Sequence, residues 1–251
     1  MTSADVLPLC AIVAVAFFTE AAIGFGSTVL TVTLGAHLLR LDVLLPAFVP
    51  LNLLLSGYLV TRHHAHIDWR TLGRRLAPPM AAGMAGGLVL YRIGTPRGLL
   101  LPFALFVTAL AAIELFRLRH PVAARPLPRM AERGLLALGG VVHGLYGSGG
   151  PMVVYCASRL VPEKSSFRST LSLLWLVLNV VLLAQFATLG QLTAHSIRLS
   201  AYLGGSLLVG LLAGEWAHGR LGERTFRLAM YAVLGVAGSS LALRTLLEAP
   251  R

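Results

Sequence analysis

Apolar residues are gathered along this chain into long runs that are separated by short polar connections. Eight runs are apparent, at residues 7–23, 43–60, 76–91, 98–116, 134–160, 169–189, 199–217 and 228–247. A helix needs about 20 such residues to cross the hydrocarbon core of a bilayer. The pattern therefore predicts an all-α polytopic integral membrane protein with nearly the whole chain embedded.

The composition agrees with this class. Hydrophobic residues make up 56% of the chain and charged residues only 12%, which leaves too few polar side chains to cover a soluble body of this size. We interpret the net charge of +11 as loops that lie on anionic lipid and follow the positive-inside bias. The arginines are spread among short connections instead of forming one face, which argues against nucleic acid as a partner.

Candidate metal ligands are present but poorly placed. Three histidines between residues 63 and 66 fall together with Asp68 in a predicted polar connection, where a solvated loop is the simpler explanation. Cys10 and Cys156 lie inside apolar runs and lack metal or redox spacing. We expect neither a metal site nor a cofactor.

Two glycine-rich strings interrupt the apolar runs at matching places in the two halves of the chain. The first string covers residues 20–28 and the second residues 143–151, and an offset of 123 sets Gly24 on Gly147. Paired helix breaks of this kind indicate a transport site near the bilayer midplane that is built from discontinuous helices.

An internal repeat organises the rest of the chain. A shift of 127 pairs Asn52 with Asn179. We expect a single transmembrane transport domain over residues 1–251, with one pseudo-repeat at about 5–117, a cytoplasmic linker at 118–133 and a second pseudo-repeat at about 134–247.

Two small-xxx-small motifs obey the same shift. Gly83 and Gly87 in the first half correspond to Gly210 and Gly214 in the second. Glycines at this spacing let helix backbones approach closely in lipid, so we expect them to mark tight helix contacts.

The helices that follow the breaks are too short to span. Residues 28–39 would form a helix about 18 Å long against a hydrocarbon core of about 30 Å, and residues 151–160 a shorter one. Each broken segment is therefore either a kinked crossing or a re-entrant hairpin. Re-entrant segments put 15 of the 21 basic residues on one face, whereas full crossings give a 12 to 9 split. The positive-inside rule thus favours two inverted pseudo-repeats, each with one re-entrant segment plus three transmembrane helices, and both termini extracytoplasmic.

A helix that starts inside the membrane presents unpaired N–H groups and a partial positive charge. Glycine lets a ligand approach such a backbone closely, so two facing helix starts would form a cradle for an oxyanion. We expect Ser27 and Thr28 to cap the first short helix and Pro151 to open the second. The expected substrate-binding residues are Gly24, Gly26, Ser27, Thr28, Gly147, Ser148, Gly149, Gly150 and Pro151, with Asn52 and Asn179. The alternative is that the glycines only allow tight helix crossings.

Two ionisable residues flank the breaks. Glu20 precedes the first break by one turn, and His143 takes the equivalent place in the second half. A carboxylate near the centre of a membrane helix is costly, so Glu20 should face the protein interior. The pair could couple transport to protons, or it could support the shape of the breaks. Farther along, Arg168 is a candidate attractor of anions at the inner mouth, and Glu215 is expected to meet water at a helix end.

The second string, GLYGSGGP at residues 144–151, its weaker copy around Gly24 and the Ile67-Asp68-Trp69-Arg70 opening of a later helix resemble the TauE/SafE family of sulfite and sulfonate exporters. The resemblance covers essentially the whole chain through its length and two-fold repeat. It implies a carrier of small sulfur-containing anions, or of related organic anions, in the bacterial inner membrane.

These observations predict a secondary transporter that moves a small sulfur-containing anion, such as sulfite, a sulfonate or a sulfoacetate-like compound, by alternating access. A carrier of a non-sulfur carboxylate is the alternative, and an intramembrane hydrolase is a weaker one. Neither Ser27 nor Ser148 stands in a nucleophile-elbow string, so we expect no enzyme. Expected partners are the anion, the bilayer and a coupling ion such as the proton, and a homo-oligomer is compatible with the sequence.

Overall fold

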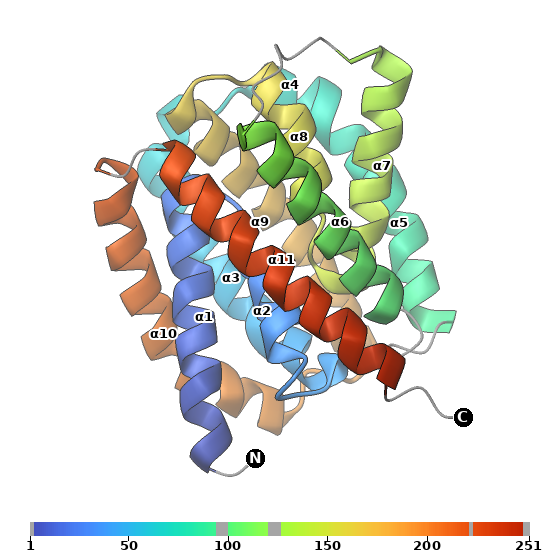
Figure 1. The fold of residues 1–251 in the computed structure, drawn as a ribbon, viewed down its shortest axis with the longest axis vertical. Helices are drawn as coiled ribbons and strands as arrows, with labels where there is room; N and C mark the ends of the chain where they lie inside the picture. Colours follow the sequence, from blue (N-terminus) through green and yellow to red (C-terminus); the bar gives the residue numbers. More distant parts are fainter. Residues whose placement is uncertain (1–2, 94–99, 120–126, 221–222, 248–251) are drawn as a thin grey trace.

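The computed structural model describes residues 3–93, 100–119, 127–220 and 223–247 of the chain (Figure 1). All regular structure in these ranges is helical. The helices are α1 (Ser3–Ile23), α2 (Ser27–Gly35), α3 (Leu41–His63), η1 (His64–His66), α4 (Trp69–Thr71), η2 (Leu72–Leu76), α5 (Ala77–Ile93), α6 (Leu100–Arg119), α7 (Arg129–Tyr146), α8 (Gly150–Leu160), α9 (Lys164–Thr188), α10 (Ala194–His218) and α11 (Glu223–Leu247).

The apolar runs coincide with these helices, and the run at 134–160 divides into α7 and α8. Among the described residues, five helices are long and apolar enough to cross a membrane. They cover Val6–Ile23, Leu41–His66, Leu101–Arg119, Lys164–Thr188 and Ala194–His218. The prediction of an all-α chain with membrane-spanning helices is therefore confirmed.

Both glycine-rich strings break the chain into helical hairpins. Helix α1 packs against α2, and α7 packs against α8. In Figure 1 the first hairpin opens toward the lower end of the molecule and the second toward the upper end. Gly24, Gly26 and Gly147 adopt φ angles of 94°, 108° and 64°, a left-handed region that other residues rarely enter. Glycine is thus required at the breaks by the backbone itself.

The first short helix is shorter than expected. It was predicted over residues 28–39, but α2 ends at Gly35 after nine residues, a length of about 14 Å. An added Cβ at Gly35 would lie 2.8 Å from Leu44 Cδ2 of α3, so the chain turns where α3 packs closely. Helix α1, with 21 residues, is long enough by itself to cross the core.

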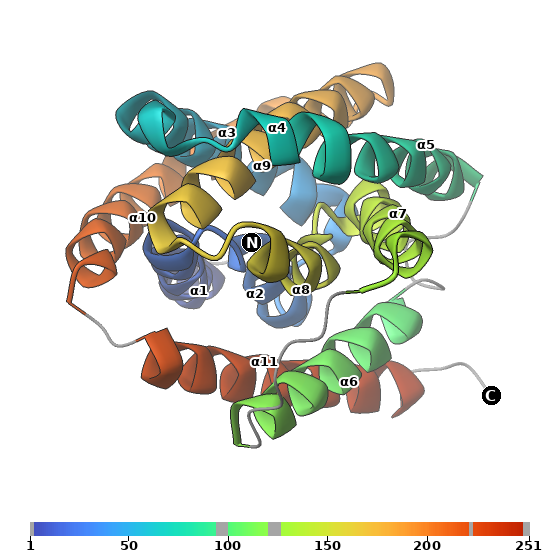
Figure 2. The ribbon, with the colours of Figure 1, turned by 90° about the horizontal axis from the view of Figure 1, so that it is seen from above.

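The two halves are packed into each other. Helix α5 of the first half lies along α7, and α10 of the second half lies along α1 (Figure 2). Helix α3 pairs with α9, and α6 with α11. The exchange of partners follows the shift seen in the sequence, in which α1 corresponds to α7 and α5 to α10. Helices α6 and α7 also extend into both ends of the predicted linker, whose residues 120–126 lie outside the described ranges.

The small-xxx-small glycines mark these exchanged contacts, as predicted. A Cβ added at Gly83 of α5 would overlap the carbonyl oxygen of Ala137 on α7. A Cβ added at Gly210 of α10 would lie 2.6 Å from the carbonyl oxygen of Ala14 on α1. Backbone meets backbone in both pairs, so the close approach is possible only with glycine.

Candidate functional site

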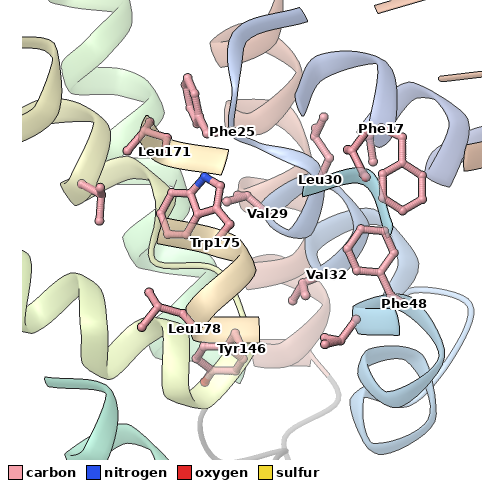
Figure 3. Packing of buried hydrophobic residues seen from close by; sticks show 14 of the residues in the cluster. Phe17, Phe25, Val29, Leu30, Val32, Phe48, Tyr146, Leu171, Trp175 and Leu178 are labelled. Atoms are coloured by element: carbon pink, nitrogen blue, oxygen red, sulfur yellow. The ribbon is translucent and has the colours of Figure 1, made fainter. Parts of the chain in front are cut away.

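The two breaks meet at a small cavity in the middle of the molecule. Its walls come from α1, α2, α3, α7, α8 and α9, and the lining residues are Glu20, Phe25, Gly26, Thr28, Val29, Asn52, His143, Gly147, Ser148, Gly150, Trp175 and Asn179. The free volume is about 20 Å³, which is room for about one water molecule. Figure 3 shows the Trp175 indole reaching from α9 toward Val29 of α2, with Phe25 close by.

Most of the residues predicted from sequence line this cavity. Nine of the thirteen do so, and Gly24, Ser27, Gly149 and Pro151 do not. Gly149 packs against α7 instead, where an added Cβ would overlap the carbonyl oxygen of Gly139. Ser27 does not line the cavity, and its hydroxyl donates a hydrogen bond to the Glu20 carboxyl group.

Glu20 lies in the last turn of α1 and is buried beside the start of α2, with 3% of its surface exposed. Its Oε2 accepts hydrogen bonds from the Ser27 hydroxyl and from Asn52 Nδ2, the latter at 2.9 Å, and its Oε1 lies 3.5 Å from the Ser56 hydroxyl. The Ser27 backbone N–H also interacts with the carboxyl group. An acid at a helix start compensates the partial positive charge there. The first helix start therefore already holds an internal carboxyl group.

Asn52 and Asn179, the pair related by the shift of 127, are joined directly. Asn179 Nδ2 donates to Asn52 Oδ1 at 2.7 Å. Asn52 in turn directs its own Nδ2 to Glu20 and to the Ser27 hydroxyl, the latter at 2.7 Å. A continuous polar chain thus runs from the break of the first half into the second half.

The second break has different polar side chains from the first. His143 is 1% exposed, and its ring stacks on Trp175 with the centroids 5.6 Å apart. Among the described residues neither ring nitrogen makes a hydrogen bond of acceptable geometry, although Asn179 lies close enough to interact with the ring. The hydroxyl of Ser148, which is 2% exposed, has no hydrogen-bond partner there either. Buried polar groups normally find partners, so this side of the cavity is the one equipped to receive a polar ligand.

Comparison with known proteins identifies the family of this chain. The sequence model of the sulfite exporter TauE/SafE family matches residues 9–241. The chain belongs to this family. No curated protein and no solved structure matches it. The matched region contains both breaks and every lining residue of the cavity, and membership identifies the chain as a membrane transporter of the sulfite exporter type.

In this TauE/SafE protein the carbonyl groups freed by the first break are satisfied by side chains from the second half. Arg168 Nη1 donates to the Ala21 carbonyl at 2.8 Å, His218 Nδ1 lies 2.7 Å from that of Ala22, and Trp175 Nε1 donates to that of Gly24 at 2.9 Å. Unpaired carbonyls cost several kcal/mol in lipid, so these contacts make the break tolerable. Sequence analysis missed Trp175, although a tryptophan one turn before Asn179 inside an apolar run was a usable signal.

Arg168 and Glu215 have partners that the sequence did not indicate. Arg168 was a candidate attractor of anions at the inner mouth, and Glu215 was expected to meet water at a helix end. Instead the Arg168 side chain is 3% exposed and forms an ion pair with Glu215, which is partly buried, while His63 Nε2 lies 2.8 Å from Arg168 Nη2. The cause is tertiary: α3, α9 and α10 converge behind the first break, which spacing along one helix cannot reveal.

The capping prediction was wrong for the first short helix. Gly26 is the N-cap of α2 and no side chain caps it, because the Ser27 hydroxyl is bound to Glu20. Helix α8 begins at Gly150, so Pro151 is its second residue, close to the expected position. This position tolerates proline, which lacks a backbone N–H, because the first N–H groups of a helix have no partner within the helix.

Proposed function

We propose that this TauE/SafE protein is a secondary transporter that carries sulfite, or a related sulfonate such as a sulfoacetate-like anion, by alternating access at the central cavity. The observation that carries the proposal is the meeting of two equivalent helix breaks, one from each half, at a single polar cavity. Discontinuous helices whose starts face one site are the usual architecture for holding an anion in a carrier.

The anion binds on the α8 side of the cavity. The start of α2 already faces the Glu20 carboxyl group, which would repel a second negative charge when ionised. The start of α8 instead has the hydroxyl of Ser148, from the break, and the ring of His143, from the last turn of α7, beside it. Both side chains line the cavity without a hydrogen-bond partner among the described residues. Backbone N–H groups of the first turn of α8 add donors and the positive end of the helix dipole.

The described conformation is a closed one. A cavity of about 20 Å³ holds about one water molecule and is too small for a sulfite or sulfonate group. Substrate entry therefore requires the walls to separate, and the hydrogen bond between Asn52 and Asn179 crosses the boundary between the two halves. This bond belongs to the set of contacts that changes as the cavity opens.

The arrangement of the hairpins supports inverted repeats. The α1–α2 hairpin and the α7–α8 hairpin open toward opposite ends, and the start of α1 and the end of α11 lie at the same end (Figure 1). Together with the positive-inside bias, this arrangement supports our proposal that both termini lie outside a bacterial inner membrane and that the linker between α6 and α7 is cytoplasmic. Glu20 and His143 are proposed to couple transport to protons.

The alternatives are distinguished by chemistry. Hydroxyl and N–H donors bind carboxylates as well as sulfonates, so a carboxylate carrier is tested by substrate competition. An intramembrane hydrolase needs a base that is hydrogen-bonded to its nucleophile. Ser148 has no such contact with His143, although both line the cavity.

Counterflow in proteoliposomes tests the proposal. Vesicles loaded with unlabelled sulfite should accumulate labelled sulfite, and the label should be recovered inside as intact sulfite. Isethionate, sulfoacetate and acetate, each added outside, rank the substrate classes. Absence of counterflow with every sulfur anion, for protein that melts cooperatively, would refute the proposal.

A matched pair of serines on the second hairpin tests the site. Ser148→Ala should raise the KM for sulfite several-fold, because the loss of one donor is worth about 1 kcal/mol. Ser158→Ala is the control, since its hydroxyl bonds to the Tyr155 carbonyl and does not line the cavity. An equal KM in both variants would place the anion elsewhere.

A further inference from the structure

A second, larger hollow lies away from the central cavity. It has a volume of about 540 Å³ and is lined by Arg70, Thr71, Arg74, Arg75, Arg129 and Arg133. These residues come from α4, η2 and the start of α7, which lie at the upper end of the molecule in Figure 1. The hollow shares no lining residue with the central cavity, and the proposed transport does not use it.

The charge in this hollow is largely uncompensated by the protein. Arg75 pairs with Glu132, donating from Nε to Oε1 at 3.1 Å and from Nη2 to Oε2. The guanidinium groups of the other four arginines make no ion pair or hydrogen bond with the described residues. Asp68 is the other nearby acid. Hydrogen bonds from the Thr71 hydroxyl and the Thr71 backbone N–H, with smaller contributions from the Arg70 backbone N–H and charge, hold the pKa of its carboxyl below the usual range.

The placement of the α7 arginines is electrostatically unfavourable in isolation. Arg129 is the first residue of α7 and Arg133 follows one turn later on the same face. A helix start carries a partial positive charge, which disfavours cations there. An anion between these guanidinium groups would remove the repulsion and also accept from the first N–H groups of α7.

The opposite wall has an irregular backbone. Arg74 and Arg75 lie in the π-helical turn Leu72–Leu76, inserted between α4 and α5. Single π-turns inside helices occur frequently at functional sites. Two large apolar side chains neighbour the hollow in sequence, Trp69 before Arg70 and Met130 after Arg129, and they are 65% and 78% exposed. Exposed tryptophan beside arginine is typical of the membrane interface.

We infer that this hollow is a second anion site, which binds a phosphate group carried by an anionic lipid headgroup or by a soluble phosphate. Its volume suits a ligand of headgroup size. Guanidinium groups bind phosphate oxygens through paired N–H donors, and a phosphate can engage several of them at once. Basic pockets at the cytoplasmic ends of membrane helices bind anionic headgroups in this way.

The test measures ligand binding to the purified full-length protein in neutral detergent. The probes are dihexanoyl phosphatidylglycerol, dihexanoyl phosphatidylcholine and inorganic phosphate. Their binding is measured by thermal shift and by native mass spectrometry. The variant is the triple Arg70→Gln, Arg74→Gln, Arg133→Gln, which keeps the ion pair between Arg75 and Glu132. The control is the triple Arg40→Gln, Arg92→Gln, Arg198→Gln, which removes the same charge from exposed residues next to the start of α3, the end of α5 and the start of α10.

Wild type and the control should bind phosphatidylglycerol at least tenfold more tightly than phosphatidylcholine, and the variant should lose that preference. Binding of inorganic phosphate with the same arginine dependence assigns the site to a soluble phosphate; its absence assigns it to lipid. The inference would be overturned if the variant bound phosphatidylglycerol and inorganic phosphate as tightly as wild type does. It would also be overturned if wild type bound neither of these probes. If the triple variant does not fold, the single Arg133→Gln variant, at an exposed position, must weaken binding at least threefold for the inference to stand.

Discussion

Gly149→Ala and Gly150→Ala should have different effects, although the two glycines are adjacent: the first should lower stability and the second should weaken substrate binding. A Cβ at Gly149 would overlap the carbonyl oxygen of Gly139 and lie 3.0 Å from its carbonyl carbon and 3.1 Å from His143 Cβ. A Cβ at Gly150 would meet only Phe25, at 3.6 Å from Cδ2, an ordinary van der Waals distance. The first substitution therefore changes the packing of α7 on α8, and the second changes the surface that faces the cavity.

The magnitudes follow from these contacts. Gly149→Ala forces a backbone shift between two packed helices, and overpacking of this kind costs about 1–3 kcal/mol. For a chain of this size that corresponds to a melting temperature lower by about 2–10 °C. Gly150→Ala has no steric penalty and gains helix propensity, so its stability should stay within about 1 kcal/mol of wild type.

Thermal melts and sulfite counterflow separate the two effects. Gly150→Ala should melt like wild type but transport with a KM at least tenfold higher, because a methyl group would stand between the α8 start and the anion. Gly204→Ala in α10 is the control, since an added Cβ there meets nothing within 4 Å. Gly150→Ala with wild-type affinity would show that the substrate does not sit at the break, and Gly149→Ala with a wild-type melt would refute the hairpin packing.

Three further predictions follow. Glu20→Gln and His143→Gln should leave expression and melting temperature nearly unchanged while altering the pH dependence of transport; unchanged profiles in both would leave them a structural role. Arg168→Gln removes the ion pair with Glu215 and a donor to the α1 end, so unfolding should become easier by about 2 kcal/mol, less than the loss of a fully buried pair because Glu215 is partly exposed; a wild-type melt would contradict this. A reporter fused after Arg251 should behave as periplasmic, and cytoplasmic activity would exclude the re-entrant topology.

The helices and the breaks could be predicted from sequence because lipid imposes simple rules. Residues that cross a bilayer must be apolar, so the runs show where the long helices lie. A sharp turn between two packed helices can require left-handed backbone, and only glycine adopts it easily, so the breaks at Gly24, Gly26 and Gly147 could be located from the sequence as well. The shift that aligns Asn52 with Asn179 identified a pair that the fold brings into contact.

The contacts that satisfy the breaks could not be predicted, because they join distant segments. Ser27 was expected to cap α2 by a local rule, yet the buried carboxyl group of Glu20 takes its hydroxyl. Arg168 was a candidate for the inner mouth and Glu215 was assigned to water at a helix end, yet the two form an ion pair in which Arg168 is buried and Glu215 partly buried. Local rules fail where a polar group in an apolar interior must find a partner from another element.

The hydrogen bond between Asn52 and Asn179 has a direction that the symmetry of the repeats does not supply. When two equivalent amides form one hydrogen bond, one donates and the other accepts, and considered by themselves the two possible directions are equally favourable. Glu20 and Ser27 decide between them, because both draw the Asn52 Nδ2 group toward the first break and leave Oδ1 to face Asn179. The second half has His143 in place of a carboxyl group, and although Asn179 lies close to this ring, no hydrogen bond of acceptable geometry joins the two side chains. Replacing the Glu20 carboxyl group by an amide would weaken the acceptor that fixes this choice, so Glu20→Gln should also loosen the hydrogen bond between Asn52 and Asn179.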